Sequence, residues 1–78
     1  MAKVTLYHTD GCHLCEKALA LLTTVICQSH IEVVDIISDS QLLAEYQTSI
    51  PVLRNQQGER LFWPFDRQSL ITFLTDKE

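Results

Sequence analysis

The chain has 78 residues, 46% of them apolar, which is enough for one small folded domain spanning 1–78. Its net charge of −4 argues against nucleic acid and anionic membranes as partners, and no apolar run reaches the ~20 residues of a transmembrane span. The N-terminus lacks the apolar segment of a signal peptide, so we expect a cytoplasmic protein whose thiols stay reduced.

The first half of the chain predicts a strand, a helix and a second strand. Residues 3–7, "KVTLY", alternate in polarity and favour a strand, and "HTDG" favours a turn. A helix is then expected from Cys12 to about Cys27, because no Gly or Pro intervenes and apolar residues recur on one face. Residues 31–37, "IEVVDII", are almost continuously apolar, which predicts a strand covered on both faces.

The second half predicts a short helix, a hairpin and a last helix. Ser38 and Gln41 fit a capping box, so the short helix should begin at Ser38 and bury Leu42, Leu43 and Tyr46. "IPVLRNQQGERLFW" favours a β-hairpin that turns at "NQQG". Asp66 can then cap the last helix.

The resulting order, β-α-β-α-β-β-α, predicts an α/β fold. Its sheet should have four strands and be mixed, because a strand–helix–strand unit makes parallel neighbours and a hairpin makes antiparallel ones. Helices should cover both faces.

The spacing Cys12-His13-Leu14-Cys15 is the strongest chemical signal. Cys12 should lie where the first turn meets the helix, and there the free N–H groups and the helix dipole stabilise a thiolate. Cys12 is therefore the expected nucleophile. Cys15, nearly one turn later, should be more enclosed and placed to resolve a mixed disulfide. His13 either lowers the pKa of Cys12 further or is an exposed residue of small effect.

A metal site is the competing use of the pair. Structural zinc takes four ligands, and Cys27 should lie roughly 18 Å from Cys15 along the expected helix. We therefore expect no metal site. Cys27 is interpreted as a small hydrophobe packed in the core, with a regulatory thiol as the alternative.

The stretch "VTLYHTDGCHLCEKALALL" is similar to the start of glutaredoxins, and "SIPVL" matches the segment in which thioredoxin-fold proteins hold a cis-proline. "LFWPFDRQSLITFL" resembles most closely a small bacterial glutaredoxin-like family. The resemblance implies a thioredoxin-like fold, Cys12 as nucleophile and Cys15 as resolving thiol. It further implies that the bond before Pro51 is cis and that the backbone of Ile50 pairs with the substrate.

The chain departs from ordinary glutaredoxins where these bind glutathione. Thr9 replaces their lysine, Asp10 adds a repelling carboxylate, and "WPFD" replaces a Gly-Gly-x-Asp segment, leaving only Asp66. We therefore expect glutathione to be a poor ligand. Trp63 and Phe65 are expected to cover the small core, with a partner-binding surface as the alternative.

The favoured function is a monomeric thiol–disulfide oxidoreductase without a bound cofactor. Its substrate would be a disulfide-containing protein or a small thiol that contacts His13, Ile50 and Pro51. One alternative is a carrier that binds an iron–sulfur cluster or a metal ion through Cys12. Another is a thioredoxin-fold interaction module without turnover.

Overall fold

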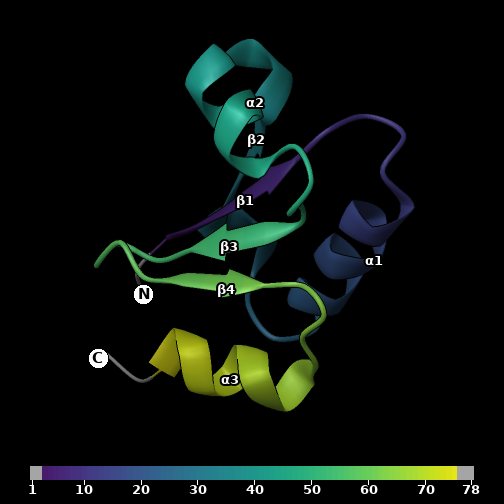
Figure 1. The fold of residues 1–78 in the computed structure, drawn as a ribbon. Helices are drawn as coiled ribbons and strands as arrows, with labels where there is room; N and C mark the ends of the chain where they lie inside the picture. Colours follow the sequence, from purple (N-terminus) through teal and green to yellow (C-terminus); the bar gives the residue numbers. More distant parts are fainter. Residues whose placement is uncertain (1–2, 76–78) are drawn as a thin grey trace.

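The computed structural model describes residues 3–75, in which a four-stranded sheet lies between helices on both faces (Figure 1). The strand order is β2-β1-β3-β4, where β1 is Val4–His8, β2 Ile31–Asp35, β3 Val52–Arg54 and β4 Arg60–Phe62. β1 runs parallel to β2 and antiparallel to β3, and β3 pairs antiparallel with β4. The predicted mixed sheet is confirmed.

Three α-helices flank the sheet: α1 (His13–Leu22), α2 (Ser40–Tyr46) and α3 (Arg67–Thr75). Two short 3-10 helices, η1 (Gln28–His30) and η2 (Ile36–Ser38), precede and follow β2. Figure 1 shows α1 and α3 on one face of the sheet and α2 at the other. No helix within residues 3–75 has the length and apolar character needed to cross a membrane.

Alternation along β1 sends side chains into two apolar clusters. Val4 and Leu6 join the larger cluster under α1 and α3, together with Ala18, Leu22, Ile26, Leu53, Phe65 and Leu70. Tyr7 points to the other face, where the smaller cluster also holds Ile36, Tyr46 and Val52. The core therefore has a layer on each side of the sheet. Because β1 and β3 contribute side chains to both layers, their positions are fixed by packing on both faces.

Trp63 and Phe65 cover this core, as expected. Phe65 is buried in the larger cluster, and Trp63 packs against the same cluster. The two rings meet edge to face with centroids 5.0 Å apart. The Trp63–Pro64 peptide bond between them is cis.

Helix α1 is shorter than predicted. It ends at Leu22, where the hydroxyls of Thr23 and Thr24 donate to the carbonyls of Ala20 (2.8 Å) and Leu21 (2.6 Å). These local bonds compete with helical ones, which is why threonine favours a helix end. The predicted continuation to Cys27 is wrong, and Cys27 lies in an extended segment before η1.

Strand β2 lies at the edge of the sheet and none of its residues is buried, so the prediction that both its faces are covered is wrong. Val33 is 43% exposed. The strand ends at Asp35, whose carboxylate accepts the N–H of Ile37 (3.0 Å) and starts η2. The apolar run therefore continues past the strand, and Ile36 fills the smaller cluster from η2.

Aspartates cap the later helices. Asp39, not Ser38, caps α2, because its Oδ1 accepts the N–H of Gln41 at 2.8 Å. The cap predicted for the last helix is confirmed: Asp66 Oδ1 accepts the N–H of Ser69 at 2.8 Å. On α2 Tyr46 is buried and Leu42 packs against the smaller cluster, but Leu43 is exposed, contrary to expectation.

Candidate functional site

A tight turn after β1 places Cys12 at the start of α1. Gly11 has a φ of +82°, a left-handed conformation that glycine adopts without strain. The N–H of Cys12 donates to the carbonyl of Thr9 (3.4 Å), and Cys12 itself has an extended backbone. Cys12 is thus the N-cap residue of α1.

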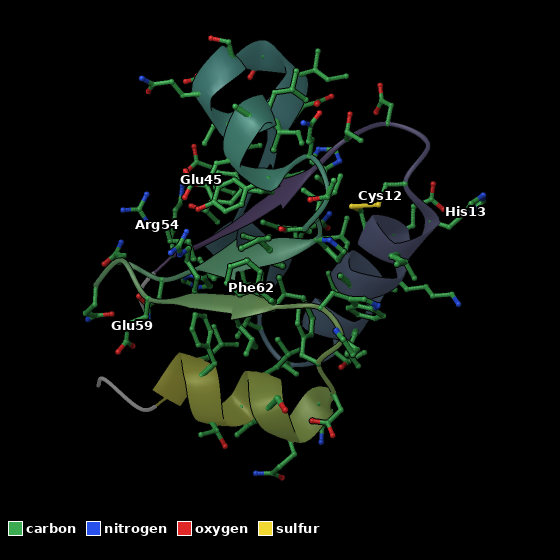
Figure 2. All side chains as sticks on the ribbon, in the orientation of Figure 1. Cys12, His13, Glu45, Arg54, Glu59 and Phe62 are labelled. Atoms are coloured by element: carbon green, nitrogen blue, oxygen red, sulfur yellow. A yellow bond between two sulfur atoms is a disulfide. The ribbon has the colours of Figure 1, made fainter. Side chains whose placement is uncertain are left out.

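The sulfur of Cys12 occupies the position that a capping oxygen takes in other helices. It accepts the backbone N–H of Cys15 at 3.1 Å, and the two cysteines form a disulfide with Cα atoms 5.2 Å apart (Figure 2). In the reduced protein the same N–H and the positive end of α1 would favour a thiolate, so the pKa of Cys12 should lie below its ordinary value.

The two sulfurs differ in access. Cys12 is half-buried at the surface, whereas Cys15 is only 3% exposed and faces the core side of α1. A substrate can therefore reach Cys12 and not Cys15. Leu14, between them in sequence, is 43% exposed. His13 is exposed too, and Figure 2 shows its ring directed away from the disulfide.

The segment before β3 lies at the same end of the sheet. Val52, the first residue of β3, pairs with Tyr7 near the end of β1, and the chain after β1 leads directly to Cys12. The Ile50–Pro51 peptide bond is cis, the conformation that the resemblance implies. Pro51 is buried and Ile50 is half-buried against the smaller cluster.

A hollow of about 190 Å³ opens beside the sulfur pair. Its apolar wall comes from Leu6, Leu19 and Val33, and its rim includes the carboxylate residues Asp10 and Glu16 together with Cys12, Cys15, His8, Thr9 and Gly11. The sequence did not predict this hollow, because the hollow depends on how β1, β2 and α1 pack together and on Val33 of β2 remaining exposed.

A larger depression lies elsewhere. It measures about 910 Å³ and is formed between β4 and α3 by residues that include Arg60, Phe62, Asp66 and Phe73. Neither cysteine of the pair lines it. Since Cys12 and Cys15 are the one cysteine pair within residues 3–75 that lies at the start of an α-helix, we place the candidate site at the smaller hollow.

Cys27 is exposed, so the expectation that it packs in the core is wrong. Its sulfur accepts the hydroxyl of Ser29 at 3.2 Å, and the bonds from Ser29 lower the pKa of this thiol. The shortened α1 is the reason: the chain leaves the helix before Cys27 and carries it to the surface.

The residues described, 3–75, contain no cluster of three or more His, Cys, Asp or Glu side chains suited to a metal ion. Arg60 pairs with Glu45 (2.8 Å) and donates to the hydroxyl of Tyr46 (3.2 Å). Tyr46 in turn stacks on Tyr7 with ring centroids 4.9 Å apart. Figure 2 shows Glu45 on the side of the molecule away from Cys12, so this cluster supports the fold and not the sulfur pair.

Comparison with known proteins matches residues 3–75 to the family described as "Glutaredoxin-like domain (DUF836)". The X-ray structure of protein XcR50 from X. campestris is 36% identical, with a TM-score of 0.86 over 96% of this chain and 99% of that one. Its solution structure is 37% identical, with a TM-score of 0.85 over 100% and 97%.

A third similar structure is protein Ne2328 from Nitrosomonas europaea, solved by NMR. It is 27% identical, with a TM-score of 0.74 over 91% of this chain and 88% of that one. No curated protein matches the sequence significantly. The predicted thioredoxin-like fold is confirmed by this agreement of family and structures.

Proposed function

The chain belongs to the glutaredoxin-like domain family, and on this basis we propose that it is a thiol–disulfide oxidoreductase acting through Cys12 and Cys15. One observation supports the proposal above the others. The sulfur of Cys12 caps α1 and accepts the N–H of Cys15 at 3.1 Å, while Cys15 itself is buried. A reachable, thiolate-stabilised sulfur and a covered second sulfur are what a two-step exchange needs.

In the first step the Cys12 thiolate attacks one sulfur of a substrate disulfide. A bond forms between Cys12 and that sulfur, the substrate S–S bond breaks, and the second substrate sulfur leaves as a thiolate. The helix N-terminus lowers the pKa of Cys12, so a larger fraction of the attacking group is ionised at neutral pH. The exposed side of Cys12 gives the substrate its path.

In the second step Cys15 releases the bound half of the substrate. Its thiol loses a proton to solvent, and the resulting thiolate attacks the sulfur of Cys12. The substrate sulfur leaves as a thiolate, and the protein is left with the Cys12–Cys15 disulfide. Two electrons have passed from the protein to the substrate, and an external dithiol or thiol must return them by attacking the accessible Cys12.

We assign the remaining substrate contacts to His13, Ile50 and Pro51. Ile50 lies at the end of the sheet where α1 begins, and its carbonyl would pair with an extended substrate, since its N–H already donates to the carbonyl of Tyr46 (3.1 Å). His13 would flank the substrate from the first turn of α1. Thr9 and Asp10 offer no cation for a glutathione carboxylate, so glutathione should bind weakly as a specific ligand.

Serine variants test the order of attack. In a Cys27→Ser background, which removes the exposed extra thiol, Cys15→Ser should accumulate a mixed disulfide with an added disulfide substrate. Cys12→Ser should form none. Mass spectrometry of the mixtures measures both. Trapping by Cys12→Ser alone would reverse the assignment, and trapping by neither variant would favour a cluster carrier or an interaction module.

A further inference from the structure

The charges around the sulfur pair are of one sign. Asp10 and Glu16 line the hollow beside Cys12, and none of the described residues that line it is a lysine or an arginine. Both carboxylates are on exposed residues at its rim. The other ionisable side chain that lines it, besides the two cysteines, is the imidazole of His8, so the two carboxylates give the hollow a negative field toward any group that approaches the Cys12 sulfur.

A polar atom in the same hollow is left without a partner. The Thr9 hydroxyl oxygen is buried and forms no hydrogen bond with any other group in the described part of the chain. Thr9 lines the hollow next to Cys12. This oxygen has almost no accessible surface, so it stays in the wall of the hollow, and the carboxylates at the rim are the oxygens that a ligand donor can reach.

The size of the hollow limits the group that enters. Its volume is about 190 Å³, which is room for several waters. A short methylene arm ending in one polar group fits this space. Leu6, Leu19 and Val33 supply an apolar wall for the methylenes, and acceptor oxygens at the rim suit an ammonium with three N–H donors.

We propose that this site selects disulfides that carry an ammonium group close to the reacting sulfur, and that Asp10 and Glu16 are the residues that select it. This inference rests on the proposed function and names its substrate class. The ammonium could come from a lysine beside the substrate cysteine or from a small aminothiol. The same charges disfavour disulfides that carry carboxylates.

The reaction balances without a further reactant in a single turnover. Reduced protein and cystamine, the disulfide of 2-aminoethanethiol, first give the Cys12 mixed disulfide and one aminothiol. Attack by Cys15 then gives the oxidised protein and a second aminothiol. The two electrons that reduce cystamine are those lost by the two cysteine sulfurs.

The test compares three small disulfides of similar length and different charge. These are cystamine (cationic), bis(2-hydroxyethyl) disulfide (neutral) and 3,3′-dithiodipropionate (anionic), each reacting with protein reduced beforehand by dithiothreitol and desalted. Each rate is divided by the rate of the same disulfide with 2-mercaptoethanol at the same pH and salt. Dividing by this reference rate removes two differences between the disulfides that do not come from the protein: their intrinsic reactivity and the general attraction of a thiolate for a cationic disulfide.

The expected preference follows from Coulomb's law. Two carboxylates about 6 Å from an ammonium in water should raise the corrected rate of cystamine roughly tenfold over the neutral disulfide at low salt. The anionic disulfide should be slower by a similar factor. At about 0.15 M salt, where the screening length is ~8 Å, each factor should fall to roughly three.

A matched pair of variants assigns the preference to the site. Asp10→Asn with Glu16→Gln should bring the corrected rates of the three disulfides to within about twofold of one another. Glu32→Gln is the control, because Glu32 lines a separate depression with Tyr7 on the other face of the sheet. It should keep the full preference.

The possible outcomes distinguish a failure of the charge selection from a failure of the proposed oxidoreductase function. Exchange with all three disulfides at equal corrected rates would overturn the charge selection and leave the oxidoreductase intact. A preference that survives in the double variant would also overturn it. No exchange with any disulfide would instead contradict the proposed function. A peptide disulfide with lysine beside cysteine, compared with cystamine, distinguishes a protein source from a small aminothiol, since the favoured source should react faster.

Discussion

Neutralising Glu16 should make Cys12 more acidic. Glu16 lines the same hollow as Cys12 and follows it by one turn of α1. Its carboxylate opposes the formation of a second negative charge on the Cys12 sulfur. The N–H of Cys15 and the helix dipole act in the other direction and favour that charge. Glu16→Gln removes the opposing charge and leaves the shape of the side chain unchanged.

The size of the effect follows from the separation. Two unit charges one helical turn apart, about 6 Å, interact by about 0.7 kcal/mol in water. Since one pKa unit corresponds to about 1.36 kcal/mol, Glu16→Gln should move the pKa of Cys12 down by about half a unit at low salt. Added salt should shrink the shift, because both groups are near the surface.

The rate of alkylation by iodoacetamide against pH measures this shift. The protein is reduced and carries Cys27→Ser, because the exposed Cys27 thiol has a lowered pKa of its own and would react alongside. The parent midpoint should lie well below the ~8.5 of a free cysteine. Glu32→Gln should leave it in place. A parent midpoint near ~8.5, or a midpoint that rises in Glu16→Gln, would refute the electrostatic reasoning.

Three further results are expected. Asp66→Ala should lower the free energy of unfolding at neutral pH, because it removes the acceptor of the Ser69 N–H. This bond lowers the pKa of Asp66. The stabilisation it gives is therefore present above the unfolded-state pKa and disappears as the pH falls through the folded-state pKa. Urea unfolding of variant and parent should therefore converge in acid, and a gap that widens there would contradict the sign. Tyr46→Ala should cost about 3–5 kcal/mol in urea unfolding, since Tyr46 is 4% exposed and stacked on Tyr7, and a loss below about 1 kcal/mol would show that the smaller cluster is dispensable. Cys27→Ser should leave the exchange rate of Cys12 unchanged in a stopped-flow assay, and a severalfold loss would place Cys27 in the reaction.

Local patterns were sufficient to predict most elements and the main features of the site. The alternation in β1 and the hairpin of β3 and β4 are properties of short segments, and so is the Asp66 cap. The position of Cys12 at the helix start also follows from the turn residues just before it. The cluster that buries Tyr46 against Tyr7 could not be predicted, because it joins α2 to β1 through tertiary packing.

The errors arose where several local signals compete. Val25 and Ile26 continue the helical pattern, yet the Thr23 and Thr24 hydroxyls bond to carbonyls at the end of α1 and stop it. Ile36 continues the apolar run of β2, yet the Asp35 carboxylate starts a turn.

The hollow beside the sulfurs could not be predicted from any single segment of the sequence. Its wall brings together β1, β2 and α1, and Val33 contributes because its side chain is left exposed. The carboxylates of Asp10 and Glu16 are visible in the sequence, but their shared rim depends on the turn at Gly11.

The reduction potential of the Cys12–Cys15 couple tests the central claim most directly. Equilibration of the protein with glutathione buffers of graded thiol-to-disulfide ratio, and with dithiothreitol buffers for the most reducing end, followed by acid quenching and counting of alkylated thiols by mass spectrometry, measures it. Because the Cys15 N–H and the end of α1 stabilise the reduced thiolate, we expect a reversible two-electron couple between roughly −270 and −120 mV, the span of redox-active pairs in thioredoxin-fold proteins. A potential below about −300 mV, typical of structural disulfides, or a pair that does not equilibrate at all, would contradict a function in thiol–disulfide exchange.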